Sequence, residues 1–246
     1  MKLRLDRLLV LRGLAPTREK AQAMILAGTV SVAGRRADKA GTPIDEDAEV
    51  AVAGPAHPFV SRGGVKLAAA LDAFGLDPAG RVCLDVGAST GGFTDCLLQR
   101  GAARVYAVDV GHGQLDARLR ADPRVVVRER INARSLSRAD VPEPVRLAAM
   151  DVSFISLRLV LPAVAPLVEA GGAIVALVKP QFEAGRGEVP RGGVVRSEET
   201  RRRVVEEVAE AGRSLGLSVG GAIPSPIRGA RGNEEFLLEF RVNCPE

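Results

Sequence analysis

The sequence predicts an α/β protein, with a small N-terminal αα-β domain followed by a Rossmann-like domain that has a mostly parallel sheet. Short apolar runs alternate with amphipathic segments from residue 59 onward, and this alternation is typical of right-handed βαβ units. A glycine-rich turn at 87–92 follows the first buried run, which is where ligands bind in doubly wound sheets. Two prolines within 54–58 interrupt every regular pattern and separate the two parts.

The N-terminal part is expected to begin with two short helices. Three leucines at helical spacing predict a helix over 4–12, and Thr17 and Gly28 mark the cap and the stop of a second one. Alternating apolar residues then predict strands at 30–32 and 49–52. A unit of this size has a small core, so we expect it to be supported by a neighbour or a partner.

The second part is expected to hold most of the chain's core. We place the boundary at the linker 54–58, which gives an N-terminal domain over residues 1–58 and a second domain over residues 59–246. That second domain is expected to open with a helix at 65–74. Its candidate strands are 82–86, 104–109, 124–127, 145–150, 173–178, 217–222 and 236–242. The most apolar stretch, 159–178, is interrupted by prolines and glycines short of the roughly 20 residues of a membrane span, so it predicts a helix, a turn and a buried strand.

Charge is unevenly distributed along the chain. Residues 1–40 hold nine Lys or Arg against three acids, a net charge of +6, whereas the whole chain of 246 residues carries only +4. A basic head on a near-neutral body is typical of proteins that bind a polyanion, because cations placed on phosphates release counterions. The alternative is a solvated helix surface. The candidate contacts to such a polyanion are Arg4, Arg7, Arg18 and Lys20.

Metal binding and secretion are not indicated. The three cysteines form no CxxC pair and only two histidines are present, so neither a metal site nor a disulfide framework is expected. Residues 1–14 are interrupted by charges and lack the apolar core of a signal peptide. Scattered thiols suit a reducing compartment, so we expect a cytoplasmic protein that does not enter the membrane.

The segment 83–93 predicts a cofactor site. It is a buried strand with an acid, Asp85, near its end, and it continues into the glycine-rich turn. The spacing GxxxGG differs from the GxGxxG of dinucleotide sites, which makes a nicotinamide cofactor the less favoured ligand. S-adenosylmethionine has no phosphate and needs close backbone approach together with acids, and Asp109 at the end of the next strand suits its ribose hydroxyls. The structural alternatives are close helix packing by the glycines and a helix cap at Asp109. The predicted cofactor-binding residues are Asp85, Gly87, Ala88, Ser89, Gly91, Gly92, Phe93 and Asp109.

Motifs along nearly the whole chain resemble one known family. They are Arg4–Asp6, Gly28–Val30, Val60–Gly64 with Lys66–Leu67, Asp85–Asp95, Val105–Gly111, Asp151–Ser156, Val178–Glu183 and Gly232–Asn233. In this order they resemble the TlyA family, haemolysin-named proteins that act as ribosomal RNA 2′-O-methyltransferases. The resemblance implies an N-terminal domain similar to that of a small-subunit ribosomal protein and an FtsJ-type catalytic domain. It also implies S-adenosylmethionine as the cofactor and ribosomal RNA or ribosomal subunits as the partner.

The resemblance further implies a tetrad of catalytic residues. These are Lys66, Asp151, Lys179 and Glu235. The family pattern places the last acid two residues after Asn233, but the neighbouring Glu234 competes for the position. If a strand begins here, its alternation sends the two carboxylates to opposite faces, so only one enters the site.

Ribose methylation independently requires such groups. A ribose hydroxyl is a weak nucleophile, and its proton has to be removed as the bond to the methyl group forms. A lysine accepts that proton only when it is uncharged, a form that burial and neighbouring cations favour. Lys179 ends a long apolar run and Pro180 favours extended backbone there, so we expect Lys179 at the carboxyl end of a buried strand. Surface ion pairing is the alternative for Lys66, Asp151 and Glu235.

Other functions are less favoured by the sequence. Residues 151–154 partly match the acid-Pro-Pro-aromatic signature of amine methyltransferases but lack both prolines, which places RNA base N-methylation second. A pseudouridine synthase would need no such cofactor loop. A pore-forming haemolysin is disfavoured because no amphipathic helix with a basic flank is evident. A non-catalytic ribosome-binding factor would not need the charged tetrad.

Overall fold

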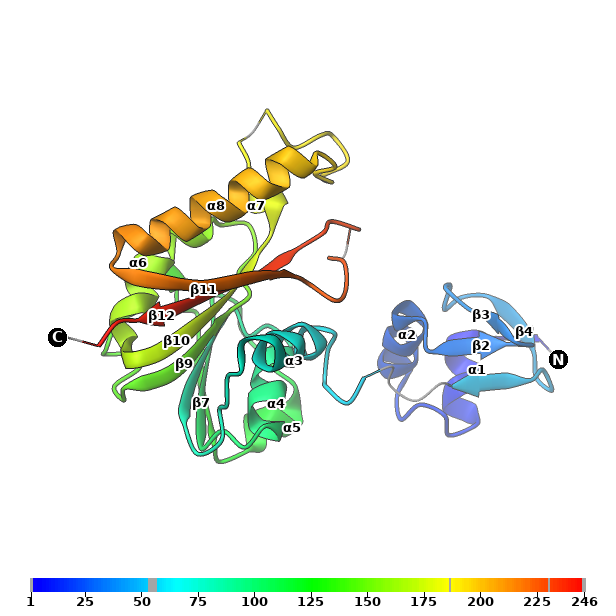
Figure 1. The fold of residues 1–246 in the computed structure, drawn as a ribbon. Coiled ribbons are helices and arrows are strands. Elements are labelled where there is room, and N and C mark those ends of the chain that lie inside the picture. Colours follow the sequence, from blue (N-terminus) through cyan, green and yellow to red (C-terminus); the bar gives the residue numbers. More distant parts are fainter. Residues whose placement is uncertain (1, 53–56, 186, 230, 245–246) are drawn as a thin grey trace. The chain divides into compact units, whose positions relative to one another are not determined.

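The computed structural model describes residues 2–52, 57–185, 187–229 and 231–244 (Figure 1). The chain forms two compact units, Met1–Pro58 and Phe59–Glu246. Within the linker expected at 54–58, residues 54–56 lie outside the described residues.

The N-terminal unit combines two helices with short antiparallel strands. In chain order these are β1 (Lys2–Arg4), α1 (Leu5–Leu11), α2 (Arg18–Ala27), β2 (Val30–Val32), β3 (Arg35–Arg36), β4 (Pro43–Asp45) and β5 (Val50–Val52). The strands pair as β3-β2-β5 and as β1-β4. Leu5 and Leu9 of α1 pack on Ile25 of α2 and Val30 of β2, which forms the small core of the unit.

Both predicted helices of this unit are confirmed. The Thr17 side chain caps α2 by accepting a hydrogen bond from the Lys20 N–H (3.2 Å), and Gly28 ends the helix in the left-handed conformation. The predicted strands correspond to β2 and β5. Three further strands, β1, β3 and β4, are two or three residues long and mostly exposed, so they show no alternation that the sequence reveals.

The second unit is a seven-stranded sheet covered by helices on both faces. Its helices are α3 (Gly63–Phe74), α4 (Gly92–Gln99), α5 (Ala117–Ala121), α6 (Leu161–Val164), α7 (Pro180–Glu183) and α8 (Glu198–Ser214). Its strands are β6 (Val82–Val86), β7 (Arg104–Asp109), β8 (Val125–Glu129), β9 (Val145–Met150), β10 (Val168–Val178), β11 (Leu217–Pro224) and β12 (Phe236–Val242). Short 3₁₀ turns lie at Ala133–Ser135, Leu157–Leu159 and Ala165–Leu167.

The strand order is β11-β12-β10-β9-β6-β7-β8, and β12 is antiparallel to both of its neighbours while the other pairs are parallel. All seven predicted strands are therefore present, and the mostly parallel sheet is confirmed. Figure 1 shows α6 and α8 on one face and α3, α4 and α5 on the other. Two separate apolar cores result, one under each layer of helices.

The sheet topology fixes where a ligand site lies. From β6 the chain proceeds outward to β7 and β8, then crosses back to β9 on the other side of β6. Strand order therefore reverses between β6 and β9, and ligands bind at the carboxyl ends of the strands next to such a reversal. The glycine turn after β6 and the residues that follow β9 and β10 all lie at this edge.

Candidate active site

The turn after β6 has a backbone that only glycine permits at its key positions. Gly87 and Gly91 have φ angles of +90° and +98°. A Cβ atom on Gly87 would lie 2.6 Å from the carbonyl oxygen of Asp151, so any side chain here would displace the residue that follows β9. On Gly92, a Cβ atom would lie 2.3 Å from the Ser61 hydroxyl. The turn therefore packs closely against Asp151 on one side and Ser61 on the other.

Asp85 stabilises the start of α4, the helix that follows this turn. Its Oδ2 accepts hydrogen bonds from the Thr94 N–H (2.8 Å) and hydroxyl (2.6 Å), which fixes the first turn of α4. Oδ1 is buried and has no hydrogen-bond partner among the described residues. Burial raises the pKa of Asp85 to about 7, and the nearby carboxylates of Asp151 and Asp109 act in the same direction. Three acids thus concentrate negative potential around the turn.

Two adjoining cavities open at this edge of the sheet. The larger, about 570 Å³, is lined by Lys66, Asp151, Lys179 and Glu235 together with residues 87–90 of the turn. The second, about 490 Å³, extends from the turn toward Asp109. Gly87, Ser89, Asp151, Ser153 and Phe154 line both cavities, so the two form one continuous depression.

The eight predicted cofactor residues fall into two groups. Gly87, Ala88, Ser89, Gly92, Phe93 and Asp109 line one or both cavities. Asp109 accepts hydrogen bonds from the N–H groups of Ser89 (2.8 Å) and Gly111 (2.6 Å), so it also shapes the turn. Asp85 and Gly91 line neither cavity. Gly91 instead faces Leu115 and Leu119, where a Cβ atom would lie within 2.8 Å of both side chains.

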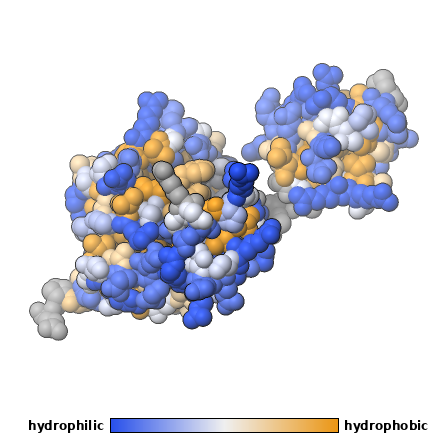
Figure 2. Space-filling model, turned by 90° about the horizontal axis from the view of Figure 1, so that it is seen from above, coloured by the Kyte–Doolittle hydropathy of each residue, from blue (hydrophilic) through white to orange (hydrophobic). Residues whose placement is uncertain are grey.

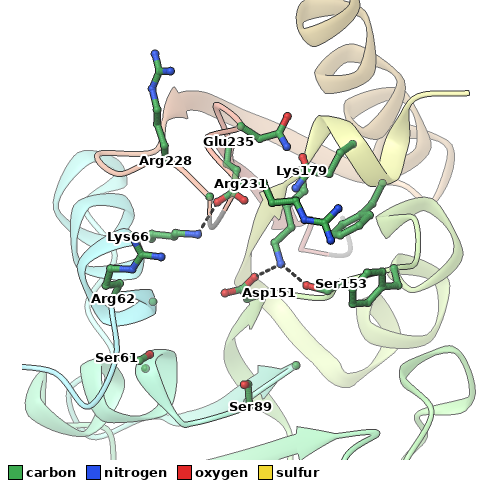
Figure 3. Close-up of a pocket in the computed structure, with 18 of the residues that line it drawn as sticks. Ser61, Arg62, Lys66, Ser89, Asp151, Ser153, Lys179, Arg228, Arg231 and Glu235 are labelled. Atoms are coloured by element: carbon green, nitrogen blue, oxygen red, sulfur yellow. Dashed lines mark hydrogen bonds and ion pairs between the residues drawn. The ribbon is translucent and has the colours of Figure 1, made fainter. Parts of the chain in front are cut away.

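The four predicted catalytic residues form two ion pairs in the larger cavity, one buried and one half-buried (Figure 3). Lys66 of α3 pairs with Glu235, just before β12, at 2.5 Å between Nζ and Oε2. Lys179, just after β10, pairs with Asp151, just after β9, at 2.5 Å between Nζ and Oδ1. Both lysines are only 8% exposed, which differs from the surface ion pairing considered as the alternative.

The Lys179 amine is held entirely by residues that follow β9. Besides Asp151, it donates hydrogen bonds to the Val152 carbonyl oxygen (2.9 Å) and the Ser153 hydroxyl (2.8 Å). The ring of Phe182 lies 5.9 Å from Nζ. Lys179 has φ −111° and ψ 102°, the extended backbone that the following proline favours. Since β9 and β10 are parallel neighbours, their carboxyl ends bring these residues together.

The geometry separates the two competing acids. Glu235 is 4% exposed and faces Lys66, whereas Glu234 pairs with Arg201 (2.5 Å) and Arg228 (2.8 Å) instead of Lys66. The two adjacent carboxylates therefore point to different sides, as alternation predicts, although β12 itself begins one residue later at Phe236.

Several lining residues were not among the predicted site residues, although Arg62 and Phe154 lie within the motifs Val60–Gly64 and Asp151–Ser156. Arg62, Arg228 and Arg231 are exposed cations at the larger cavity (Figure 3). Phe154 is 89% exposed, has a φ of +63°, and lies 5.1 Å from the Phe182 ring. No spacing rule identifies these residues, because they come together only when the loops between strands fold.

The four basic residues predicted to contact RNA differ in whether they are already bound to an acid of the same unit. The fully buried carboxylate of Asp6 accepts two hydrogen bonds from Arg4 (3.1 and 3.0 Å), one from Arg18 (2.9 Å) and one from Gln22 (2.9 Å). The Arg4 hydrogen bond, above all, holds the pKa of Asp6 well below its usual range. Arg7 and Lys20 are exposed. Hydrophilic residues cover much of the face of this unit that Figure 2 shows.

Family models match both units of the chain. The FtsJ-like methyltransferase model matches residues 59–242, and the S4 domain model matches residues 3–50. Fold, glycine turn and family match agree, so the second unit is an FtsJ-like methyltransferase domain preceded by an S4 domain.

Known proteins match nearly the whole length of this chain. The 16S/23S rRNA (cytidine-2′-O)-methyltransferase TlyA of Mycobacterium tuberculosis is 49% identical over 240 residues, 97% of this chain and 90% of that protein. Hemolysin A of Brachyspira hyodysenteriae is 39% identical over 98% of this chain and all of that protein. A solved structure of a hemolysin-named protein from Streptococcus thermophilus has a TM-score of 0.78 and 45% identity, covering 99% of this chain and 90% of that one. The chain therefore belongs to the TlyA family. Among its described residues, no helix has both the length and the apolar character needed to span a membrane.

Proposed function

We propose that this protein transfers the methyl group of S-adenosylmethionine to a ribose 2′-hydroxyl of ribosomal RNA. The observation that carries the proposal is the pairing of the buried Lys179 amine with Asp151 in a cavity that the glycine turn also lines. The names of the relatives support the substrate class, because the Mycobacterium tuberculosis protein is named for 2′-O-methylation of 16S and 23S rRNA. The S4 domain supports an RNA partner.

The residues around the turn fit S-adenosylmethionine. Because Gly87 has no side chain, the backbone of Asp151 lies directly against the turn, and both residues line the same cavity. Asp109 and Asp151 line the cavities next to the turn, and their carboxylates suit a cofactor that carries a sulfonium and an ammonium. We assign Asp109 to the ribose hydroxyls of the cofactor and residues 87–92 to its methionine part.

The reaction needs a proton to leave the ribose hydroxyl as that oxygen is methylated. S-adenosylmethionine supplies the electrophilic methyl group. The Lys179 amine, fixed by Asp151 and Ser153, is the group that we assign to accept the hydroxyl proton. Lys66 and Glu235 offer a donor and an acceptor in the same cavity that hold the ribose in place. The exposed arginines at this cavity are suited to the phosphates on either side.

Transfer of tritium tests the proposed function. The purified chain, S-[methyl-³H]adenosylmethionine and separate small and large ribosomal subunits should give label in the rRNA of at least one subunit. Absence of label from both subunits and from protein-free rRNA would contradict the assignment.

Cofactor binding gives an independent prediction. S-adenosylmethionine at about 100 times its Kd should stabilise the folded chain by about 2.7 kcal/mol and raise its melting temperature. Gly87→Ala should abolish the binding heat in calorimetry, because its Cβ atom would clash with Asp151. Gly80→Ala is the matched control, since Gly80 also has a positive φ (+68°) but a Cβ atom there meets nothing within 4 Å. Tighter binding of NAD than of S-adenosylmethionine would refute the cofactor assignment.

A second prediction concerns the basic N-terminal unit. The double change Arg7→Gln with Lys20→Gln should weaken rRNA binding and lower the slope of log affinity against log salt by about 0.7 to 0.9 for each phosphate that these cations neutralise. Arg7 and Lys20 are better test positions than Arg4 and Arg18, which hold Asp6 and support the fold. Filter binding at several salt concentrations measures the slope. An unchanged slope, or an equal change in the exposed α8 variant Arg202→Gln, would contradict the prediction.

A further inference from the structure

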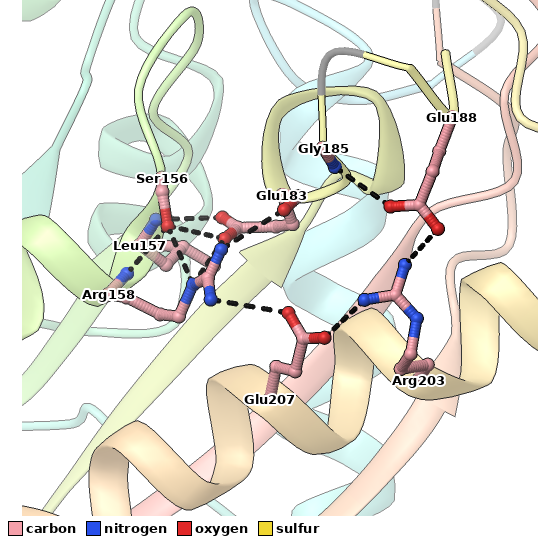
Figure 4. Close-up of polar contacts among 8 residues, drawn as sticks. All are labelled: Ser156, Leu157, Arg158, Glu183, Gly185, Glu188, Arg203 and Glu207. Carbon is pink, nitrogen blue, oxygen red and sulfur yellow. Dashed lines mark hydrogen bonds and ion pairs between the residues drawn. The ribbon is translucent and has the colours of Figure 1, made fainter.

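Glu183, the last residue of α7, ties that helix to the segment that follows β9 (Figure 4). Its Oε1 accepts a hydrogen bond from the Leu157 N–H (2.7 Å), and its Oε2 accepts one from the Ser156 hydroxyl (2.5 Å). The Arg158 guanidinium lies 3.6 Å from Oε2 and also donates a hydrogen bond to the Glu183 carbonyl oxygen (3.1 Å). Both carboxylate oxygens and the backbone carbonyl of Glu183 therefore hold residues 156–158. These contacts between Glu183 and residues 156–158 are called the Glu183 tie below.

Packing alone does not explain an acid at this position. Glu183 is 4% exposed, and burial raises its pKa above the usual range because low-dielectric surroundings disfavour the charged form. An apolar side chain of similar size would avoid this cost. What an apolar side chain lacks is the pair of acceptors that hold the Ser156 hydroxyl and the Leu157 N–H.

A second group of contacts, made by Lys179, lies at the other end of the segment 151–158. Lys179 directly precedes α7, and its amine contacts residues 151–153. Between the two groups of contacts, the rings of Phe154 and Phe182 lie 5.1 Å apart. The segment after β9 thus runs alongside α7 and is fastened to it at both ends.

Outer ion pairs connect the Glu183 tie to α8. Arg158 pairs with Glu207 at 3.2 Å, Glu207 with Arg203, and Arg203 with Glu188 at 2.5 Å (Figure 4). These four side chains are 32–42% exposed, so each outer pair is weak alone. The buried Glu183 is the member on which the tie depends.

We propose that Glu183 is a positioning residue for methyl transfer, which fixes the backbone around the Lys179 amine by holding the segment 151–158. This inference rests on the proposed function, because Glu183 acts only through Lys179. A group that accepts a proton works within a narrow range of distance and angle, and a displacement of about 1 Å costs up to about 100-fold in rate. Glu183 lines neither cavity, so binding of the cofactor and the RNA does not depend on it directly.

Steady-state methyl transfer by the full chain with Glu183→Gln tests the proposal. Glutamine keeps the size of the side chain but replaces one of its two acceptor oxygens with a donor. We expect kcat to fall about 10- to 100-fold, with KM for S-adenosylmethionine and for the ribosomal subunit nearly unchanged. Ser156→Ala removes one of the two bonds and should lower kcat by a smaller factor. The two changes combined should cost less than the product of their separate effects, because both act through one tie.

Val204→Ala is the matched control for stability. Val204 lies in α8, is fully buried in the same apolar core as Leu157, and has no polar side-chain atom that could join the tie. Unchanged kcat in Glu183→Gln, or an equal loss of kcat in Val204→Ala at an equal loss of melting temperature, would overturn the positioning role. Wild type and Lys179→Ala run in the same assay. No transfer by the wild type would instead refute the proposed function, whereas full transfer by Lys179→Ala would remove Lys179 from the mechanism and the positioning role of Glu183 with it.

Discussion

Replacing Lys179 with alanine should lower kcat by about 10²- to 10⁴-fold, the range that a positioned proton acceptor contributes. Affinity for the RNA and for the cofactor should change little, because the basic N-terminal unit and the glycine turn remain intact. Single-turnover methylation together with separate binding measurements distinguishes these effects. Turnover close to that of the wild type would remove Lys179 from the mechanism.

Lys179→Arg separates proton transfer from simple charge. Arginine keeps the positive charge beside Asp151 but stays protonated at any usable pH, so it accepts no proton from the ribose hydroxyl. The arginine variant should therefore be as inactive as the alanine variant. Substantial activity in Lys179→Arg would show that the residue only stabilises charge or orients its neighbours.

Glu235→Gln should have the second largest effect, because it leaves the Lys66 ammonium buried without its countercharge. Removing one partner of a buried pair costs about 3–5 kcal/mol, and part of that loss should be seen as lower stability and part as lower kcat. Glu234→Gln changes the neighbouring acid, whose own side chain is 40% exposed, and should cost about 0–1 kcal/mol with activity retained.

Thermal unfolding and initial rates measured side by side check this pair of variants. Equal losses in both variants would mean that either acid can serve Lys66. Loss of activity in Glu234→Gln alone would reverse the assignment of the two carboxylates.

The sequence predicted the architecture well because the apolar patterns of the second unit are strong. Each buried strand is a run of apolar residues bounded by turn residues, and each of the seven was located. Three strands of the N-terminal unit, β1, β3 and β4, were not predicted. They are two or three residues long and mostly exposed, so their sequences contain no run of alternating apolar residues.

Local spacing located the turn but not the role of every residue in it. Asp85 stands where an acid was expected, yet both bonds to its Oδ2 come from Thr94, so it supports α4 behind the cavities. Whether its other oxygen faces the cofactor stays a prediction. Glu183 and Ser156 lie in the family motifs Val178–Glu183 and Asp151–Ser156, but neither motif predicts that the two side chains meet, because the contact forms only when β9 and β10 pair.

The total charge of the N-terminal unit does not show which of its cations are free to contact RNA. Counting residues 1–40 gave a basic head, but the acids Asp45, Glu46, Asp47 and Glu49 follow at the end of β4 and in the turn that precedes β5. Two of the four predicted RNA contacts are also engaged by the buried Asp6. The location of exposed cations, rather than the total charge, therefore decides which residues to test.

The chemical position of the transferred methyl group tests the central claim most directly. Ribosomal RNA labelled by this protein from S-[methyl-³H]adenosylmethionine is hydrolysed in alkali, which cleaves a phosphodiester only next to a free 2′-hydroxyl. The account predicts label in alkali-resistant dinucleotides, because a ribose 2′-O-methyl group blocks that cleavage. Label confined to mononucleotides would place the methyl group on a base and contradict ribose methylation.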